Sequence, residues 1–291
     1  MWMLFAFLAA FSWATADLFS KRLMNFDGKS EYVTLFARFV FSLPLLFVVY
    51  LATSPHRCDV RFWLVNLVII PGDVVASTLY IKALKLSPIS IVVPLMSFAP
   101  VFMLLSSPIF LGEWPSPAGV LGVIMVTVGA YTLNINLSKY GIWEPLKALF
   151  KDKGPLYTII AAAIFSVDTA FGKKAIYYSD VYFFSFWYSL LMSVAYLPVV
   201  YKNSKGSLAD IFKDWKFYAV GVLFGVGVLS FLVAIKLANI AYVSALGKVS
   251  MVIAVLYGKF FLGEESFKER LLGVFIMLAG IFLIFYAQLL K

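Results

Sequence analysis

Long apolar runs alternate with short polar connections along the whole chain. Each run holds about 20 residues, the length that an α-helix needs to cross the hydrocarbon core of a bilayer. Most connections are 4 to 14 residues long, which leaves no room for a soluble domain. The pattern predicts an all-α membrane protein with ten transmembrane helices, in the runs 2–24, 32–53, 62–81, 88–110, 117–136, 156–176, 181–201, 216–236, 240–262 and 269–290.

An internal repeat divides these runs into two sets of five. The segment ALKLSPISIVVPL, which starts at Ala83, resembles AIKLANIAYVSAL, which starts at Ala234. The same offset of 151 residues relates further positions downstream, which are LGE at 111–113 and 262–264 and the glycine pairs Gly122/Gly273 and Gly129/Gly280. Leu-Gly-Glu is also typical of a helix that ends with glycine in the C-cap region.

Five crossings in each copy have a topological consequence. Because five is odd, the second copy must enter the membrane from the opposite side, and we expect two inverted five-helix repeats related by a pseudo-two-fold axis in the membrane plane. We assign residues 1–137 to the first repeat and 155–291 to the second. The connection 138–154 places apolar side chains on one helical face and lysines on the other, which predicts an interfacial amphipathic helix.

The composition supports a membrane location. Hydrophobic residues make up 63% of the chain and charged residues 13%, too few charges to cover a soluble domain of 291 residues. The net charge of +9 comes from residues in connections and at run ends, which favours contact with anionic membrane lipid and not with nucleic acid. One cysteine and one histidine cannot make a disulfide or a zinc cluster, so we expect no metal, no cofactor and no enzyme.

Two copies of five helices, each with an A-L-K or A-I-K turn and a later L-G-E, resemble the drug/metabolite transporter superfamily, and within it the ten-helix EamA-type transporters. The resemblance covers nearly the whole chain. It implies a carrier for a small-molecule metabolite that works by alternating access, with a central cavity between two halves. A narrower similarity relates Ser244–Lys248 to the GALNK motif of nucleotide-sugar transporters, in which Ala245, Leu246 and Lys248 match and positions 244 and 247 differ.

Five ionisable residues lie well inside apolar runs, namely Asp17, Arg38, Asp73, Asp168 and Lys248. Each would cost about 2.5–3.5 kcal/mol near the middle of the bilayer if it faced lipid. They must therefore face one another or water, and three acids with two bases allow nearly complete pairing. We predict that these five side chains contribute to a substrate-binding site.

Lys248 is the leading candidate among them. It follows Gly247, where the backbone can open, and its run is the repeat counterpart of the run that carries Pro94 and Pro100. Inverted-repeat transporters bind substrates at broken helices near the middle of the membrane. We therefore expect Lys248 to bind substrate; the alternative is a structural ion pair, for example with Asp168.

The other candidates each have two interpretations. Asp17 and Asp168 lie in pseudo-symmetric runs and would suit proton coupling, or each anchors a helix. Arg38 binds substrate or pins two helices together. Asp73 follows a Pro-Gly pair that should kink its run, and it either lines the cavity or has a structural role. The deep aromatic residues Trp13, Trp187 and Tyr188 either stack on a substrate or pack in the bundle.

These observations predict an integral, multi-pass transporter in the plasma (cell inner) membrane. We expect it to export a small polar or amphipathic metabolite with proton or counter-substrate coupling, and the resemblance to EamA-type transporters implies a metabolite that is amino-acid-like in chemistry. Two rivals stay open at this point. One is a nucleotide-sugar or sugar-phosphate exchanger, and the other is a membrane scaffold or sensor that transports nothing and whose charges are fully paired.

Overall fold

The computed structural model describes residues 1–25, 30–54, 57–87, 89–134, 143, 146–147, 151–203, 211–262 and 267–289. All regular structure in these residues is helical, and they contain no strand. The all-α part of the prediction is confirmed for these residues. The predicted amphipathic helix at 138–154 falls largely outside the described residues, as does the second Leu-Gly-Glu after Leu262.

Seven helical segments in the described part of the chain are long and apolar enough to cross a membrane, namely Trp2–Met24, Tyr32–Ala52, Val60–Tyr80, Pro94–Leu111, Lys153–Tyr178, Val181–Lys202 and Trp215–Leu237. Three shorter apolar helices are Pro117–Leu133, Ile240–Ile253 and Leu272–Ala287. Each of these ranges overlaps one predicted run. The chain is thus a multi-pass membrane protein, while the count of ten crossings stays a prediction.

The helices form two compact units, and each unit takes helices from both halves of the sequence. Unit 1 comprises Met1–Val74 and Gly172–Leu237. Its complete helices are α1 (Trp2–Asn25), α2 (Glu31–Val40), α3 (Leu43–Ala52), α10 (Val181–Asn203) and α11 (Trp215–Leu237). The long helices α4 (Val60–Leu86) and α9 (Lys153–Tyr178) each contribute residues to both units.

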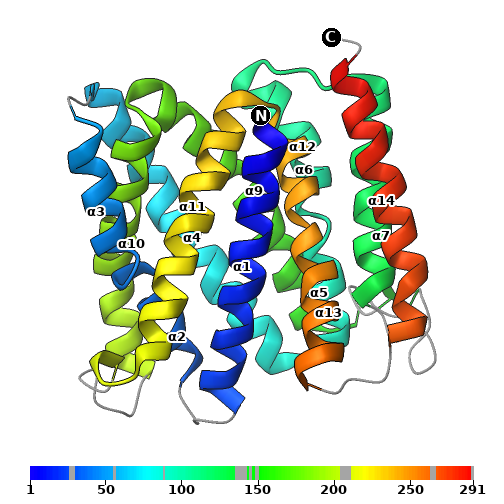
Figure 1. The fold of residues 1–291 in the computed structure, drawn as a ribbon, viewed down its shortest axis with the longest axis horizontal. Helices are drawn as coiled ribbons and strands as arrows, with labels where there is room; N and C mark the ends of the chain where they lie inside the picture. The colour runs from blue at the N-terminus through cyan, green and yellow to red at the C-terminus, as the bar shows by residue number, and fades with distance from the viewer. Residues whose placement is uncertain are drawn as a thin grey trace. The chain divides into compact units, whose positions relative to one another are not determined.

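Small residues let the helices of unit 1 approach closely. α1 and α11 lie side by side over most of their length (Figure 1). A side chain at Gly227 of α11 would overlap the indole of Trp13 in α1, and one at Gly221 would overlap Phe41. Without a hydrophobic driving force inside the bilayer, such close packing is a main source of helix association.

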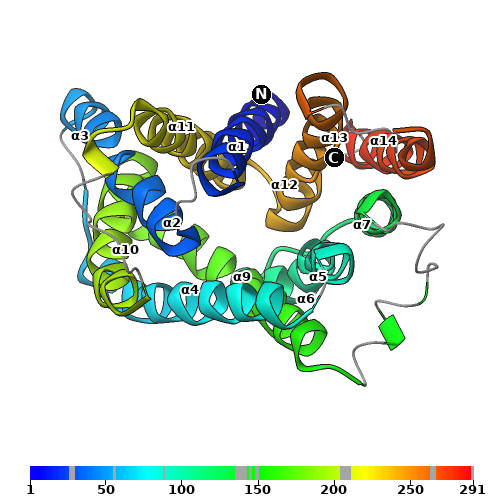
Figure 2. The ribbon, with the colours of Figure 1, turned by 90° about the horizontal axis from the view of Figure 1, so that it is seen from below.

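Unit 2 comprises Val75–Phe171 and Ala238–Lys291. Its complete helices are α5 (Ile89–Met96), α6 (Ala99–Ser106), the π-helical turn η1 (Ser107–Leu111), α7 (Pro117–Asn134), α12 (Ile240–Gly247), α13 (Val249–Leu262) and α14 (Phe267–Leu289). The end-on view in Figure 2 shows α7 beside α14.

Four glycines form the contact between α7 and α14, and we call them the glycine seam: Gly122, Gly129, Gly273 and Gly280. A Cβ added at Gly129 would lie 2.7 Å from the carbonyl oxygen of Gly273, and one at Gly122 would lie 2.8 Å from that of Gly280. Residue numbers rise along one helix as they fall along the other, so the two helices are antiparallel. The seam therefore brings the two helix backbones into direct contact.

Prolines account for two interruptions inside single apolar runs. The second run is divided into α2 and α3 at Phe41–Ser42, and Pro44 lies in the first turn of α3, where its missing N–H costs no hydrogen bond. The fourth run is divided into α5 and α6, and Pro100 takes the same place in α6. The run then ends at Gly112, whose φ of 69° is left-handed. The predicted glycine C-cap at 111–113 is confirmed.

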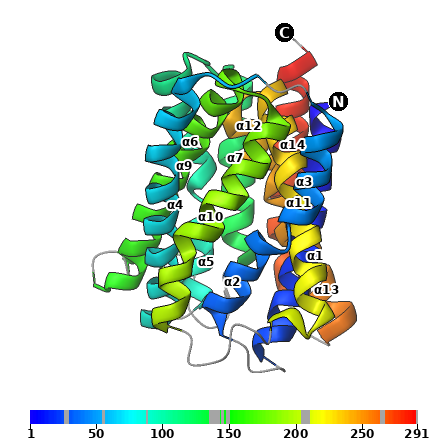
Figure 3. The same ribbon diagram turned by 90° about the vertical axis from the view of Figure 1, so that its left-hand side faces the viewer.

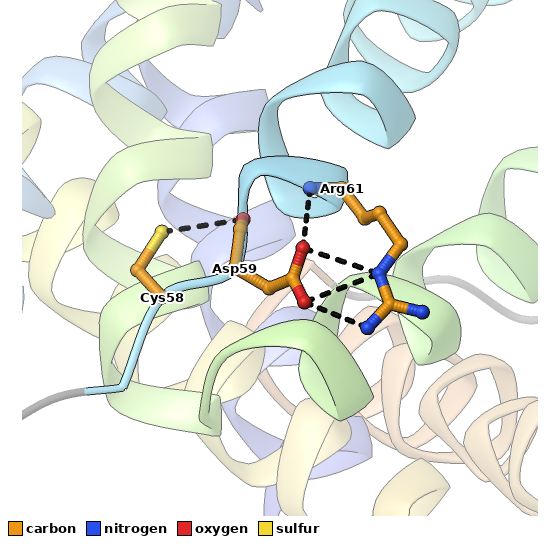
Figure 4. Close-up of polar contacts among 3 residues, drawn as sticks. All are labelled: Cys58, Asp59 and Arg61. Atoms are coloured by element: carbon orange, nitrogen blue, oxygen red, sulfur yellow. Dashed lines mark hydrogen bonds and ion pairs between the residues drawn. The ribbon is translucent and has the colours of Figure 1, made fainter.

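Asp59 caps the start of α4 outside the membrane span. One carboxylate oxygen accepts the backbone N–H of Arg61 at 2.8 Å, and the Arg61 guanidinium binds both oxygens (Figure 4). These bonds from Arg61 lower the pKa of Asp59 from its ordinary value to about 2. The backbone N–H of Asp59 also donates to the carbonyl of Tyr178, which fixes the start of α4 to the end of α9. α10 begins at this end of unit 1 and runs away from it (Figure 3).

Candidate functional site

Lys248 stands at a helix break, as the sequence predicted. α12 ends at Gly247 and α13 begins at Val249, so Lys248 is the C-cap residue between them. Its side chain is only partly buried. Among the described residues of unit 2, no carboxylate pairs with its ammonium group. An ammonium has three donors, so Lys248 has donors to offer beyond the bond described next.

The Lys248 ammonium donates to the carbonyl of Met96 at 3.4 Å. Met96 is the last residue of α5, and in a continuous helix its carbonyl would accept the N–H of residue 100. Residue 100 is proline and has no N–H. The carbonyl is therefore left open by the α5–α6 break, and a lysine from the counterpart break approaches it.

A second contact joins the same two breaks. Ser97 follows Met96 and is the repeat counterpart of Lys248 at the offset of 151. Its hydroxyl lies 3.8 Å from the sulfur of Met251 in α13. The two interrupted helices therefore meet at their interruptions, through the residue at each break.

The start of α12 is held firmly. Asn239 caps the helix by accepting the N–H of Ala241 at 2.9 Å, and its amide donates to Ser107 at 2.8 Å. One turn on, the hydroxyl of the fully buried Tyr242 accepts the N–H of Ser116 at 2.8 Å, and a side chain at Gly119 would overlap its ring. These contacts fix the N-terminal part of α12, and Lys248 lies at the opposite, C-terminal end of this helix.

Asp168 is 6% exposed and lies in the part of α9 that belongs to unit 2. Ser166, two residues before it, is bonded to α6: the Ser106 hydroxyl donates to the Ser166 carbonyl at 3.1 Å, and the two hydroxyls are 3.2 Å apart. This pair fixes the height of Asp168 relative to α6.

Asp17 and Arg38 form an ion pair in unit 1. An Arg38 Nη lies 2.6 Å from Asp17 Oδ1 and 2.9 Å from the hydroxyl of Ser20. The Asp17 side chain is 55% exposed and that of Arg38 is 22% exposed. The pair joins α1 to α2 and leaves the carboxylate accessible.

Asp73 and Tyr188, which were predicted separately as site residues, form a second pair in unit 1. Asp73 is 7% exposed, and its Oδ2 accepts the Tyr188 hydroxyl at 2.8 Å. The Tyr188 ring also contacts Phe39 and Phe184. The contact joins α4 to α10 through a carboxyl group and a neutral donor.

The two predicted tryptophans lie in aromatic clusters of unit 1. Trp13 packs against Phe231 with ring centroids 5.2 Å apart, and Trp187 packs against Trp63 at 5.1 Å. The Nε1 atom of each indole is buried and has no acceptor among the described residues. Packing accounts for the depth of both rings, and it leaves their N–H groups unused.

The structure thus brings four of the eight predicted residues together as two pairs, Asp17 with Arg38 and Asp73 with Tyr188. Sequence reasoning missed Lys173, a lysine in α9 that is only 2% exposed and that has interactions of its own. It also missed Asn239 and Tyr242 as anchors of α12. An asparagine directly before an apolar helical stretch is an N-cap signal that could have revealed the first of these.

The model of the EamA-like transporter family matches this chain twice, over residues 1–135 and 152–286. The chain belongs to the EamA-like transporter family. It is also 28% identical to an uncharacterized transporter of Archaeoglobus fulgidus over 210 residues, which cover 70% of this chain and 69% of that protein. A protein of known crystal structure, 17% identical, has the same fold with a TM-score of 0.79 over 100% of this chain and 98% of its own.

Membership in the EamA-like transporter family, within the drug/metabolite transporter superfamily, confirms the resemblance seen in the sequence. With its apolar helices, it makes the chain an integral multi-pass membrane transporter. The polar contacts described above are therefore the contacts of an EamA-like transporter.

Proposed function

We propose that this EamA-like transporter exports a small polar or amphipathic metabolite, amino-acid-like in chemistry, across the plasma (cell inner) membrane by alternating access. The observation that carries the proposal is Lys248, a lysine at a helix break whose described bond is a single long one to a backbone carbonyl. A structural lysine at this depth should be compensated by an acid. A lysine that binds a carboxylate substrate should keep donors available.

The proposed architecture is ten transmembrane helices in two inverted repeats, 1–137 and 155–291. The glycine seam supports it. At the offset of 151, Gly122 corresponds to Gly273 and Gly129 to Gly280, so the contact between Gly122 and Gly280 maps onto that between Gly273 and Gly129. Self-complementary contacts of this kind are typical of a two-fold axis.

The helix breaks support the same architecture. α5 spans Ile89–Met96 and α12 spans Ile240–Gly247, so both bounds differ by the repeat offset. Two antiparallel spanning helices that are related by a two-fold axis require that axis to lie in the membrane plane, as inverted repeats do.

The proposed substrate contacts are Lys248 and Arg38 for a carboxylate or phosphate, Asp168 and Asp17 for an amine, and Trp13, Trp187 and Tyr188 as stacking residues. A zwitterion would use both charge types. The GALNK-like segment favours a nucleotide sugar as the second candidate, because the same lysine would then bind a phosphate.

The test is uptake into proteoliposomes from a mixed metabolite pool, read by mass spectrometry, with wild-type protein, Lys248→Met and Lys236→Met. Lys236 is an exposed lysine in the last turn of α11 and serves as the matched control. We expect Lys248→Met to fold and melt like the wild type but to lose transport, and Lys236→Met to keep it. Stabilisation by the accepted metabolite, which grows as RT ln(1 + [L]/Kd), should vanish only in Lys248→Met.

Other outcomes distinguish the rivals. If Lys248 has a structural role, Lys248→Met should lower the melting temperature, because breaking a buried ion pair costs about 3–5 kcal/mol. Selective exchange of nucleotide sugars would identify the second candidate. A wild-type protein that folds and moves no metabolite would favour a scaffold or sensor and would refute the proposal.

A further inference from the structure

The two acids of unit 1 that lie inside apolar runs have different partners. Asp17 is more than half exposed and is neutralised by Arg38 at 2.6 Å. Asp73 is 7% exposed, and its bond from a described residue comes from the uncharged hydroxyl of Tyr188 at 2.8 Å. Only one of these carboxyl groups therefore carries a cation beside it.

A buried carboxylate without a neighbouring cation is costly in a low-dielectric environment, and proton binding removes that cost by removing the charge. A tyrosine hydroxyl is compatible with both forms. It donates to an ionised carboxylate, and it also donates to the carbonyl oxygen of a protonated carboxyl group. The hydrogen bond between Tyr188 of α10 and Asp73 of α4 can therefore persist while the charge of Asp73 changes from −1 to 0.

The other charged groups of unit 1 helices do not pair with Asp73 in the described structure. Arg38 of α2 binds Asp17 and Ser20. Lys173 and Lys174 of α9 have interactions of their own, and no ion pair joins either of them to Asp73. α10 presents Tyr188 and, one turn to either side, the buried neutral residues Phe184 and Met192. The groups that the structure places against Asp73 are thus neutral.

We propose that Asp73 is the proton-binding site that couples this transporter to the proton gradient. One proton from water on one side of the membrane binds a carboxylate oxygen of Asp73 and leaves to water on the other side. The inference rests on the proposed transport function, and it moves proton coupling from the pair Asp17 and Asp168 to a residue of the third run.

The first test needs no substrate. Full-length protein is reconstituted in phosphatidylcholine liposomes, and infrared difference spectra are recorded between acidic and alkaline buffer. We expect the carboxylic acid C=O band of a buried protonated carboxyl group in the wild type and its loss in Asp73→Asn. Asp17→Asn is the matched control and should keep the band. A band in Asp73→Asn as intense as that of the wild type, or a wild type without the band, would overturn the proposal, and a weaker band that remains in Asp73→Asn belongs to the other buried carboxyl group, Asp168.

The second test uses the metabolite found in the uptake screen. Vesicles are given either a pH gradient or equal pH with labelled metabolite outside and unlabelled metabolite inside. In Asp73→Asn we expect the ratio of gradient-driven accumulation to exchange to fall to the level of vesicles without a gradient. If accumulation and exchange disappear together, Asp73 holds a cationic metabolite and not a proton, which overturns the inference. If the wild type exchanges nothing, the transport proposal fails while the infrared test still decides the proton site.

Discussion

At the scale of single residues, three of the charges that lie inside apolar runs have different neighbours in the described part of this transporter. Asp17 has a guanidinium, Asp73 has a phenol, and Lys248 has a backbone carbonyl that proline leaves open. The first neighbour cancels the charge, the second tolerates either charge state, and the third only orients the group. The three side chains are therefore suited to different roles, Asp17 to pinning helices and, as proposed above, Asp73 to proton exchange and Lys248 to ligand binding.

Asp59 allows a test of an ion pair outside the membrane. Its pKa of about 2 lies below the ordinary value of about 3.9, so the unfolded chain binds more protons in the acidic range. The stabilisation is present above about pH 4 and is lost as the pH falls towards 2. We expect Asp59→Asn to melt below the wild type at neutral pH and the difference to shrink on acidification. A difference in melting temperature that does not change between pH 6 and pH 3 would contradict this assignment.

At the scale of helices, sequence reasoning located the runs but not all of their interruptions. The break at Lys248 was readable from Gly247 and that in the fourth run from its prolines. The break between α2 and α3 was missed because Pro44 at the start of α3 was read as part of one continuous run. The ion pair between Asp17 and Arg38 was not predictable either, because it joins residues 21 positions apart whose meeting depends on how α1 and α2 pack.

The glycine seam gives the prediction at this scale. Gly129→Ala places a methyl group 2.7 Å from a backbone oxygen of α14, and a backbone cannot swing aside as a side chain can. We expect destabilisation of about 1–3 kcal/mol, as for other overpacked sites, measured by thermal unfolding in detergent. Gly280→Ala, the repeat counterpart, should behave alike.

Gly172→Ala is the control for the seam. Its methyl group would meet Phe184 at 3.5 Å, an ordinary contact, and alanine favours a helix over glycine by about 0.5–1 kcal/mol. It should be as stable as the wild type or more so. Equal melting temperatures for Gly129→Ala and Gly172→Ala would show that the α7–α14 contact is looser than described.

At the scale of the whole molecule, the sequence revealed the family and the repeat, because both rest on motifs at a constant offset. It did not reveal how the chain divides into compact units. The units exchange helices between the sequence halves, since α1 packs on α11 and α7 packs on α14. Which helices pack together depends on surfaces that become complementary only after folding. The local sequence around Gly122 or Gly227 does not indicate which helix packs against it.

The single cysteine allows a test of repeat inversion. Cys58 precedes Asp59, which is bonded to Tyr178 near the start of α10, and α10 then runs 23 residues, or roughly 34 Å, to Asn203. We expect an impermeant maleimide to label Cys58 from one side of oriented vesicles and the variant Cys58→Ser/Asn203→Cys from the other. Burial and the nearby charges of Asp59 and Asp180 raise the pKa of the Cys58 thiol, so labelling should be done at alkaline pH. Labelling of both positions from one side would exclude inverted repeats.

The glycine seam also bears on the evolutionary history of the chain. Residues 1–137 alone would leave the glycine face of α7 uncovered, because its partner α14 belongs to the other sequence half. A half-length ancestor would thus have needed a second copy, with its glycine-bearing helix antiparallel to α7, to bury that face. Two separate copies associate only as often as their concentration in the membrane allows. Two copies joined in one polypeptide can make the same contact within every molecule. Joining them also lets each half diverge, and Ser97 opposite Lys248 is one place where the halves have already become different.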